Sequence, residues 1–163
     1  MDLISPCPRY NANGIACPEL PPGSVSANTR HHGQLQLPTW VAGQDVTVQF
    51  EQHGSAHGGG HCEFSLSYDG GTNFVVIHQV MGHCFYDSSN REIRNYTFTL
   101  PTRCIFSWTW VNAIGNREFY QNCADIAITG ESPSLSGKAM TILNYPGYPT
   151  VPEFMGNFNT GDG

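Results

Sequence analysis

The chain has 163 residues, which is enough for one domain with a buried core. Only 12% of the residues are charged, and 18 glycines and 11 prolines favour short strands and many turns over helices. Lys138 is the single lysine and the net charge is −6, which argues against binding to a nucleic-acid backbone. Since no apolar run approaches the roughly 18 residues of a membrane-spanning helix, we expect neither a nucleic acid nor a membrane as partner.

The cysteine content indicates an oxidising compartment. Six cysteines occur without any Cys-x-x-Cys pair, so we expect three disulfides in an extracellular, secreted protein rather than a zinc or redox site. The start of the sequence lacks the basic and apolar regions of a signal peptide, and we interpret the chain as a mature form whose leader has been removed. Asn95-Tyr96-Thr97 makes Asn95 a candidate glycosylation site.

The first part of the chain has no sustained period, and residues 1–38 are expected to form an irregular arm. Regular structure is expected to begin near Thr39. Residues 45–50 alternate apolar and polar side chains, as a strand with one exposed face does. Residues 62–68 and 74–80, joined through Asp69-Gly70-Gly71, predict a β-hairpin.

The second half of the chain continues the strand pattern. Residues 96–100 alternate up to Pro101, and a row of aromatic side chains follows at period two, which predicts a buried strand face (Phe106, Trp108, Trp110). Residues 114–116 predict a turn, and 118–128 a returning strand that points Ile126 and Ile128 into the core.

The whole pattern predicts one domain over residues 1–163. We expect an all-β, immunoglobulin/fibronectin-like antiparallel β-sandwich of seven or eight strands with its core at about 39–130. The segment 131–163, interrupted by prolines, is expected to be a second irregular arm.

Three disulfides are expected to staple this fold. Cys62 and Cys84 flank the predicted hairpin and are expected to close its open end. Cys7 with Cys123 would fix the N-terminal arm to a central strand, which leaves Cys17 with Cys104. Six cysteines allow other pairings for these last four.

A glycine-rich loop at residues 56–62 carries the first candidate site residue. His57 precedes three consecutive glycines, so its imidazole is expected to be little shielded by other side chains. Imidazole suits copper, zinc, iron or nickel, so the residue type alone does not select the metal. The alternative is a solvated loop histidine without a ligand.

Glu118 and Tyr120 form the second candidate. They stand two residues apart and therefore share one face of the predicted strand. A phenol there can serve as a weak axial metal ligand, and the neighbouring carboxylate can position water or oxygen. The alternative is a structural tyrosine beside a glutamate paired with Arg117 or Arg94.

Two stretches of the chain carry a family resemblance. Residues 57–69 (HGGGHCEFSLSYD) and 108–124 (WTWVNAIGNREFYQNCA) resemble the fungal, chitin-active class of lytic polysaccharide monooxygenases and its secreted relatives. The opening at residues 6–10 (PCPRY) is similar to the starts of those relatives. The resemblance extends over about residues 1–130.

The resemblance implies a β-sandwich that presents one copper ion on a flat face. In that family the N-terminal histidine, through its amine and ring, and an internal histidine hold the metal. The resemblance assigns the internal ligand to His57 and the axial tyrosine to Tyr120. It also assigns the neighbouring acid to Glu118, and it places Ala56 at the open axial position. Copper would then supply the oxygen chemistry that attacks a glycosidic linkage in a crystalline polysaccharide.

The chain departs from the family at its first residue, which is Met1 rather than histidine. Family members can begin His-Met, so Met1 can correspond to the second residue. Without that histidine, the family's mode of copper binding and catalysis is not expected. Six other histidines could in principle compensate, although no spacing indicates it (His31, His32, His53, His61, His78, His83).

Two functions follow as expectations. The first is a secreted copper monooxygenase that oxidises chitin or a related polysaccharide with the help of a reductant. The second is a catalytically silent secreted β-sandwich that binds copper or glycan, or that self-assembles as a subunit of an extracellular filament. Tyr10, Tyr145 and Tyr148 are candidates for stacking on sugar rings in either case.

Overall fold

The fold was analysed in a computed structural model that describes residues 3–6, 38–52, 54–100, 105–130 and 135–155. The described residues form nine strands and no helix: β1 (Leu3–Ser5), β2 (Thr39–Val41), β3 (Asp45–Phe50), β4 (Gly60–Ser67), β5 (Val75–Val80), β6 (Asn95–Thr99), β7 (Ile105–Asn112), β8 (Tyr120–Asp125) and β9 (Ala127–Thr129). This part of the chain therefore contains no helix long and apolar enough to cross a membrane.

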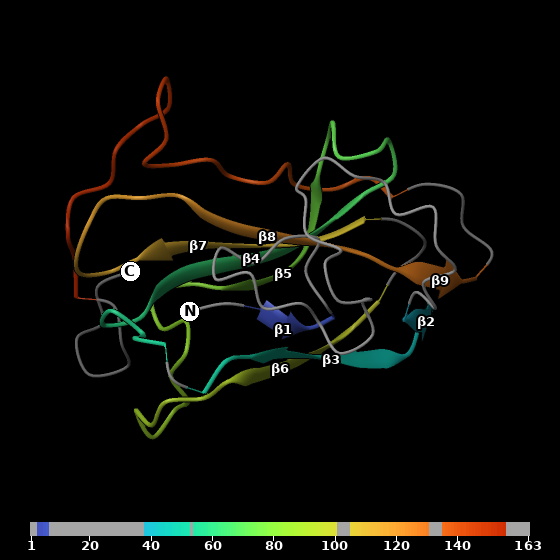
Figure 1. Cartoon of the computed structure of the whole chain (residues 1–163), viewed down its shortest axis with the longest axis horizontal. Coiled ribbons are helices and arrows are strands. Elements are labelled where there is room, and N and C mark those ends of the chain that lie inside the picture. The colour runs from blue at the N-terminus through green and yellow to red at the C-terminus, as the bar shows by residue number, and fades with distance from the viewer. Residues whose placement is uncertain (1–2, 7–37, 53, 101–104, 131–134, 156–163) are drawn as a thin grey trace, which may run out of the picture.

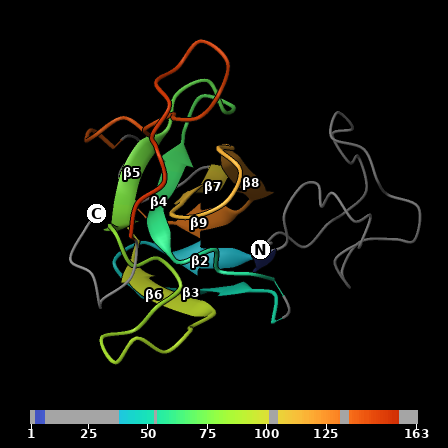
Figure 2. The same cartoon turned by 90° about the vertical axis from the view of Figure 1, so that its left-hand side faces the viewer.

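The strands build two facing sheets and one short pair. One sheet has the order β1-β3-β6 and the other has the order β5-β4-β7-β8, both antiparallel, whereas β2 and β9 pair in parallel. The two larger sheets lie as separate layers in Figures 1 and 2. The predicted all-β sandwich is confirmed, while the immunoglobulin/fibronectin-like topology stays a prediction.

Aromatic side chains fill the space between the layers. The predicted row on β7 is buried, because Phe106, Trp108 and Trp110 are each at most 1% exposed. Phe50 from β3 meets Trp108 edge-on with ring centroids 4.7 Å apart. The rings of Phe64 on β4 and Phe98 on β6 lie 5.1 Å apart. Contacts of this kind pair aromatic side chains of one sheet with those of the other and so hold the two layers together.

The predicted hairpin is confirmed as β4 and β5, which pair antiparallel. Gly70 and Gly71 at its tip have φ values of +74° and +94°, the conformation for which an Asp-Gly step is suited. Asp69 accepts hydrogen bonds from the backbone and side chain of Asn73 at 2.9 and 2.7 Å. These bonds stabilise the carboxylate and lower the pKa of Asp69 to about 2.

The strand predicted over residues 118–128 is divided into two. β8 begins at Tyr120 and pairs with β7, and after Ile126 the chain leaves this sheet and pairs with β2 as β9. The alternation of buried and half-buried residues continues through the break, since Ala124, Ile126 and Ile128 are all buried. Side-chain periodicity therefore predicted the inward face correctly, but it contains no information about which sheet supplies the hydrogen bonds.

Two short segments outside the expected core join the fold. β1 lies within the arm that was expected to be irregular, and Leu3 is fully buried opposite Phe50 of β3. The described C-terminal residues 135–155 form no strand, as expected, yet Lys138 and Thr141 bind Glu63 of β4. Glu63 there accepts hydrogen bonds from Lys138 Nζ at 2.6 Å and from the backbone N–H of Thr141 at 2.8 Å.

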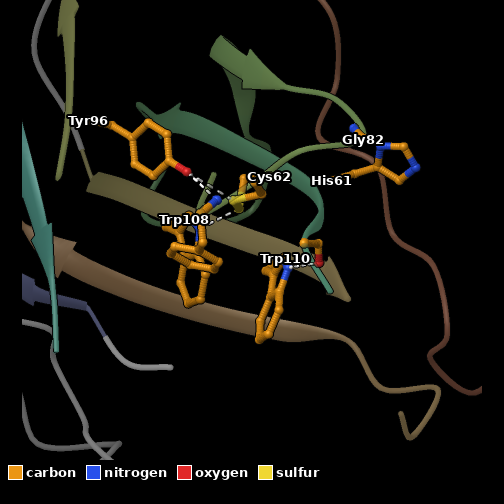
Figure 3. Close-up of a disulfide and its surroundings, with 9 residues drawn as sticks. His61, Cys62, Gly82, Tyr96, Trp108 and Trp110 are labelled. Atoms are coloured by element: carbon orange, nitrogen blue, oxygen red, sulfur yellow. Dashed lines mark hydrogen bonds between the residues drawn. A yellow bond between two sulfur atoms is a disulfide. The ribbon is translucent and has the colours of Figure 1, made fainter. Parts of the chain in front are cut away.

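The Cys62–Cys84 disulfide is confirmed and lies deep in the core, with both cysteines fully buried. Figure 3 shows its aromatic surroundings. Trp108 donates from Nε1 to the sulfur of Cys62 at 3.2 Å, and the hydroxyl of Tyr96 lies 3.6 Å from the sulfur of Cys84. Cys123 lies on β8, whereas Cys7, Cys17 and Cys104 lie outside the described residues, so the other two predicted bridges stay predictions.

Candidate functional site

The strand directions bring several connections to one end of the sandwich. β3 ends and β4 begins there, and β7 ends and β8 begins at the same end, because β4 and β7 are antiparallel neighbours. β1 runs antiparallel to β3, so its first residue, Leu3, also faces this end. The end is therefore formed by the 51–59 loop, the 113–119 turn and the start of β1 (Figure 1).

His57 lies in the first of these loops and is exposed, as predicted. Its backbone has a φ of +42°, and the following glycines at 58, 59 and 60 also have positive φ values. Ala56, by contrast, is buried, with 2% of its surface exposed, and its methyl group belongs to the hydrophobic core. The role that the resemblance gives to Ala56 stays a prediction.

The glycine run is required by close packing against the 113–119 turn. A Cβ at Gly60 would lie 2.1 Å from the carbonyl oxygen of Val111, and a Cβ at Gly58 would lie 2.8 Å from Cδ1 of Ile114. From the sequence, the glycines are expected only to leave the imidazole of His57 open. They also let the loop approach the backbone of β7 and the turn that follows it.

The 113–119 turn holds His57 through backbone contacts. The N–H of Ile114 donates to the carbonyl oxygen of His57 at 3.0 Å, and the N–H of Ala113 donates to that of Gly59 at 3.1 Å. Gly115 lies directly against the imidazole, because a Cβ there would be 3.1 Å from Nδ1 of His57. The turn thus restricts where the ring of His57 can lie.

Trp110 connects the two predicted parts of the site. Its buried ring lies 5.8 Å from the ring of His57 and 5.0 Å from the ring of Tyr120, measured between centroids. The indole is itself fixed, because Nε1 donates to the carbonyl oxygen of Gly59 at 3.2 Å (Figure 3). His57 and Tyr120 therefore lie at the same end of the sandwich and contact the same aromatic ring.

Glu118 and Tyr120 are joined directly. The hydroxyl of Tyr120 donates to Oε2 of Glu118 at 2.5 Å. Burial of the phenol, and then the hydrogen bond and negative charge of Glu118, raise the pKa of Tyr120 to about 12. The arginines considered as partners of Glu118 bond elsewhere: Arg117 to the carbonyl oxygen of Gly115 at 3.1 Å, and Arg94 to Glu92. The phenol is thus neutral and oriented at neutral pH.

This pairing predicts a titration result for Glu118→Gln. The substitution removes the negative charge beside the phenol but leaves its burial, so the pKa of Tyr120 is expected to fall from about 12 and to stay above the ordinary value of about 10. Ultraviolet titration of tyrosinate measures it, with Tyr120→Phe as the control that identifies the Tyr120 signal. An unchanged titration curve would show that Glu118 does not interact with the phenol.

The described residues contain only part of a metal site. No group of three His, Cys, Asp or Glu side chains that could hold a metal occurs among them. His61 accepts a hydrogen bond from the N–H of Gly82 at 3.0 Å and stacks on Phe154, and burial lowers its pKa. His78 stacks on Phe98, and burial lowers its pKa as well. Of the other candidates, His83 follows β5, whereas His31, His32 and His53 lie outside the described residues.

The C-terminal segment supports the site in a way that the sequence did not indicate. Oε1 of Glu153 accepts a hydrogen bond from the N–H of Gly115 at 2.7 Å, and the N–H of Phe154 donates to the carbonyl oxygen of Ala113 at 3.1 Å. Both contacts hold the turn that packs on His57. No periodic signal precedes them, and their partners lie 38 residues or more earlier in the chain, so no local pattern could have found them.

Two other predicted surface features are exposed. Asn95, the candidate glycosylation site, lies at the start of β6 with its side chain accessible, and its modification stays a prediction. Tyr145 and Tyr148 are 56% and 48% exposed, whereas Tyr10 lies outside the described residues.

Comparison with known proteins supports the resemblance read from the two stretches. No family model matches the chain. An AA11 family lytic polysaccharide monooxygenase A from Aspergillus fumigatus is 44% identical over 97 residues, covering 56% of this chain and 41% of that protein. An AA11 family lytic polysaccharide monooxygenase from Aspergillus oryzae is 34% identical over 112 residues, covering 58% of this chain and 26% of that protein.

A third relative, the AA11 family lytic polysaccharide monooxygenase B of Aspergillus fumigatus, is 35% identical over 97 residues and covers 48% of this chain and 23% of that protein. The chain spans less than half the length of these curated relatives. The predicted resemblance is therefore confirmed: over about half of its length, this chain is similar to fungal lytic polysaccharide monooxygenases of the AA11 family.

Proposed function

We propose that this chain is a secreted, copper-dependent protein of the lytic polysaccharide monooxygenase type that oxidatively cleaves chitin or a related polysaccharide. The observation that carries the proposal is the joint contact of His57 and Tyr120 with Trp110 at one end of the sandwich, in a chain whose sequence is similar to AA11 relatives over about half of its length. Bound copper, reduced by an external reductant, would supply the oxygen chemistry in this function.

The residues present fit part of a copper site. His57 offers an exposed imidazole, a donor that suits copper, and its ring is restricted by Gly115 and Trp110. Tyr120 would contribute a neutral phenol as a weak ligand, and Glu118 would hold that phenol in place. Glu118 is exposed and can accept a proton or orient water at this position.

A second imidazole would enter the site from the start of β1. The N–H of Leu3 donates to Oδ1 of Asn122 at 3.1 Å, two residues along β8 from Tyr120. β1 also points its amino-terminal side toward the end that holds His57. A histidine directly before Met1 would be three residues from Leu3, a span of at most about 10 Å of extended chain.

A secreted location is supported by the core of the fold. The Cys62–Cys84 disulfide is fully buried, and such bonds persist in oxidising compartments. Outside the cell, the proposed partners are a polysaccharide surface and a reductant.

The experiment that tests the function compares two forms of the protein, the chain that begins with Met1 and the same chain with a histidine directly before Met1. Each is loaded with copper and incubated with ascorbate and with chitin or cellulose in separate arms, and oxidised oligosaccharides are detected by mass spectrometry. We expect release by the form that begins with histidine, and no release without ascorbate.

Two outcomes would count against the enzyme. Copper binding without any oxidised product from chitin or cellulose would support the silent copper-binding alternative. Failure of both forms to bind copper, with His57 intact and the protein folded, would remove the copper proposal as a whole.

A further inference from the structure

The 113–119 turn, which lies against His57, keeps its local shape through one buried side chain. Asn112 is fully buried at the end of β7, and its Nδ2 donates to the carbonyl oxygens of Ile114 at 2.9 Å and of Asn116 at 3.0 Å. Both acceptors lie within a few residues of the donor, so these bonds close the turn locally. The shape of the turn therefore does not depend on the C-terminal segment.

Gly115 is bonded to charged side chains on both sides of its backbone. Its N–H donates to Oε1 of Glu153 at 2.7 Å, and its carbonyl oxygen accepts from Nε of Arg117 at 3.1 Å. Gly115 has a φ of +108°, and it lacks the Cβ that restricts the backbone of other residues. The two charged side chains thus select one orientation for a backbone that could otherwise adopt several.

The orientation of Gly115 acts directly on the imidazole of His57. A Cβ at Gly115 would lie 3.1 Å from Nδ1 and 3.7 Å from Cε1 of that ring, so the Gly115 backbone limits the space of the ring on this side. The ring of Trp110 limits it as well, with its centroid 5.8 Å away. Trp110 is buried in the core, whereas Gly115 belongs to a loop, so Gly115 is the neighbour whose place depends on further contacts.

Glu153 reaches Gly115 from a stretch of the C-terminal segment that is itself attached to this end of the sandwich. The N–H of Phe154 donates to the carbonyl oxygen of Ala113 at 3.1 Å, and its ring stacks on that of His61 with centroids 4.8 Å apart. In Figure 1 this red part of the chain runs beside the turn that joins β7 to β8. Glu153 is nevertheless exposed, so burial alone does not account for its contact with Gly115.

A carboxylate is a strong acceptor for this purpose. A hydrogen bond from a backbone N–H to a carboxylate is roughly twice as strong as one between neutral groups. The groups that orient a metal-binding histidine matter for its affinity, and the loss of one typically costs about 10–100-fold. Glu153 acts on the ring through the backbone of Gly115, so the lower end of this range applies.

We propose that Glu153 is a positioning residue for His57, which keeps the imidazole in one orientation by holding the backbone of Gly115. That the positioned ring binds copper rests on the proposed function. The positioning itself does not, because Gly115 lies against the ring without any metal.

The first measurement uses metal-free protein and nuclear magnetic resonance of isotope-labelled imidazole rings, with His57→Asn to identify the signals of His57. In Glu153→Ala the N–H of Gly115 loses its acceptor. The His57 signals are therefore expected to shift toward those of an unrestricted histidine, and the nanosecond motion of the ring is expected to increase. Glu153→Gln keeps an oxygen that can accept the bond, and it is expected to give signals close to those of the wild type.

The second measurement is the copper affinity and the electron paramagnetic resonance spectrum of protein with a histidine directly before Met1. Glu153→Ala is expected to bind copper about tenfold more weakly and to show altered hyperfine coupling. Glu153→Gln is expected to stay within about threefold of the wild type, since a neutral acceptor keeps about half of the strength of the bond.

Lys138→Met separates positioning from a general loosening of the C-terminal segment. It removes a different attachment of the same segment, the 2.6 Å bond from Lys138 Nζ to Glu63, and leaves the contact with Gly115 in place. Its His57 signals and its copper affinity are expected to equal those of the wild type. Since Glu153 and Lys138 are both exposed, all of these variants are expected to stay folded, which thermal unfolding checks.

Three outcomes would overturn the inference. The first is a set of unchanged His57 signals in Glu153→Ala. The second is an equal change in Glu153→Ala and Lys138→Met, which would show loosening of the segment. The third is loss of cooperative unfolding in both Glu153 variants, which would give the residue a role in folding.

The two measurements also separate this inference from the proposed function. If the protein binds no copper, the proposed function fails, and the ring signals of the metal-free protein still decide the role of Glu153. If the wild type binds copper and Glu153→Ala leaves the ring signals and the affinity unchanged, only the inference fails.

Discussion

Replacing His57 with asparagine is expected to weaken copper binding about 100-fold or more. Mutation of a residue that only orients a metal ligand typically lowers metal affinity about 10–100-fold, and loss of a direct ligand should lower it at least as much. Asparagine is chosen because His57 has a φ of +42°, a conformation that asparagine tolerates better than alanine. Calorimetric titration with copper, on protein with a histidine directly before Met1, measures the change.

His78→Gln is the matched histidine control for this prediction. The His78 ring stacks on Phe98 of β6, away from the His57 loop, and its loss is expected to leave copper affinity unchanged. A thermal unfolding curve establishes that each variant is folded. Equal copper affinity of His57→Asn and the wild type would contradict the assignment of His57 as a ligand.

Removing the Cys62–Cys84 bridge is expected to produce the largest loss of stability. The two cysteines are 22 residues apart, and a loop of this length corresponds to about 3 kcal/mol of chain entropy in the unfolded state. In C62A/C84A the indole N–H of Trp108 also loses its sulfur acceptor in the core, which costs about 1–3 kcal/mol more. Urea unfolding of the wild type and the variant measures the difference in the free energy of unfolding.

C62S/C84S separates the two contributions. A serine hydroxyl can still accept the hydrogen bond from Trp108. We therefore expect this variant to lose the stabilisation from chain entropy but to keep part of the stabilisation from the Trp108 hydrogen bond. A free energy of unfolding for C62A/C84A within about 1 kcal/mol of the wild type would show that the bridge does not stabilise the fold.

The fold was predictable where one face of a strand packs against the core. The alternation of residues 45–50 and the aromatic row of β7 predicted buried faces that the structure confirms, because burial follows the period of a strand. The division of residues 118–128 between two sheets was not predictable in this way. Both parts have the same period, and the change occurs through pairing of β9 with β2, which lies far away in the sequence.

The candidate site was predictable only in its residue types. His57 is exposed and Glu118 lies beside Tyr120, as the two motifs indicated. The bracing of His57 by Gly115, and of Gly115 by Glu153, depends on contacts between three separate segments. Neither spacing nor composition encodes such contacts, because each of them is set by how the loops pack at one end of the sandwich.

The proposed convergence of His57 and Tyr120 on one metal position is tested most directly by diffraction at the copper absorption edge. Crystals would be grown from copper-loaded protein with a histidine directly before Met1. We expect one anomalous peak, which would place a copper ion within bonding distance of a ring nitrogen of His57 and on the side of the Tyr120 hydroxyl. A peak at His61, His78 or His83, with His57 unliganded, would contradict this account.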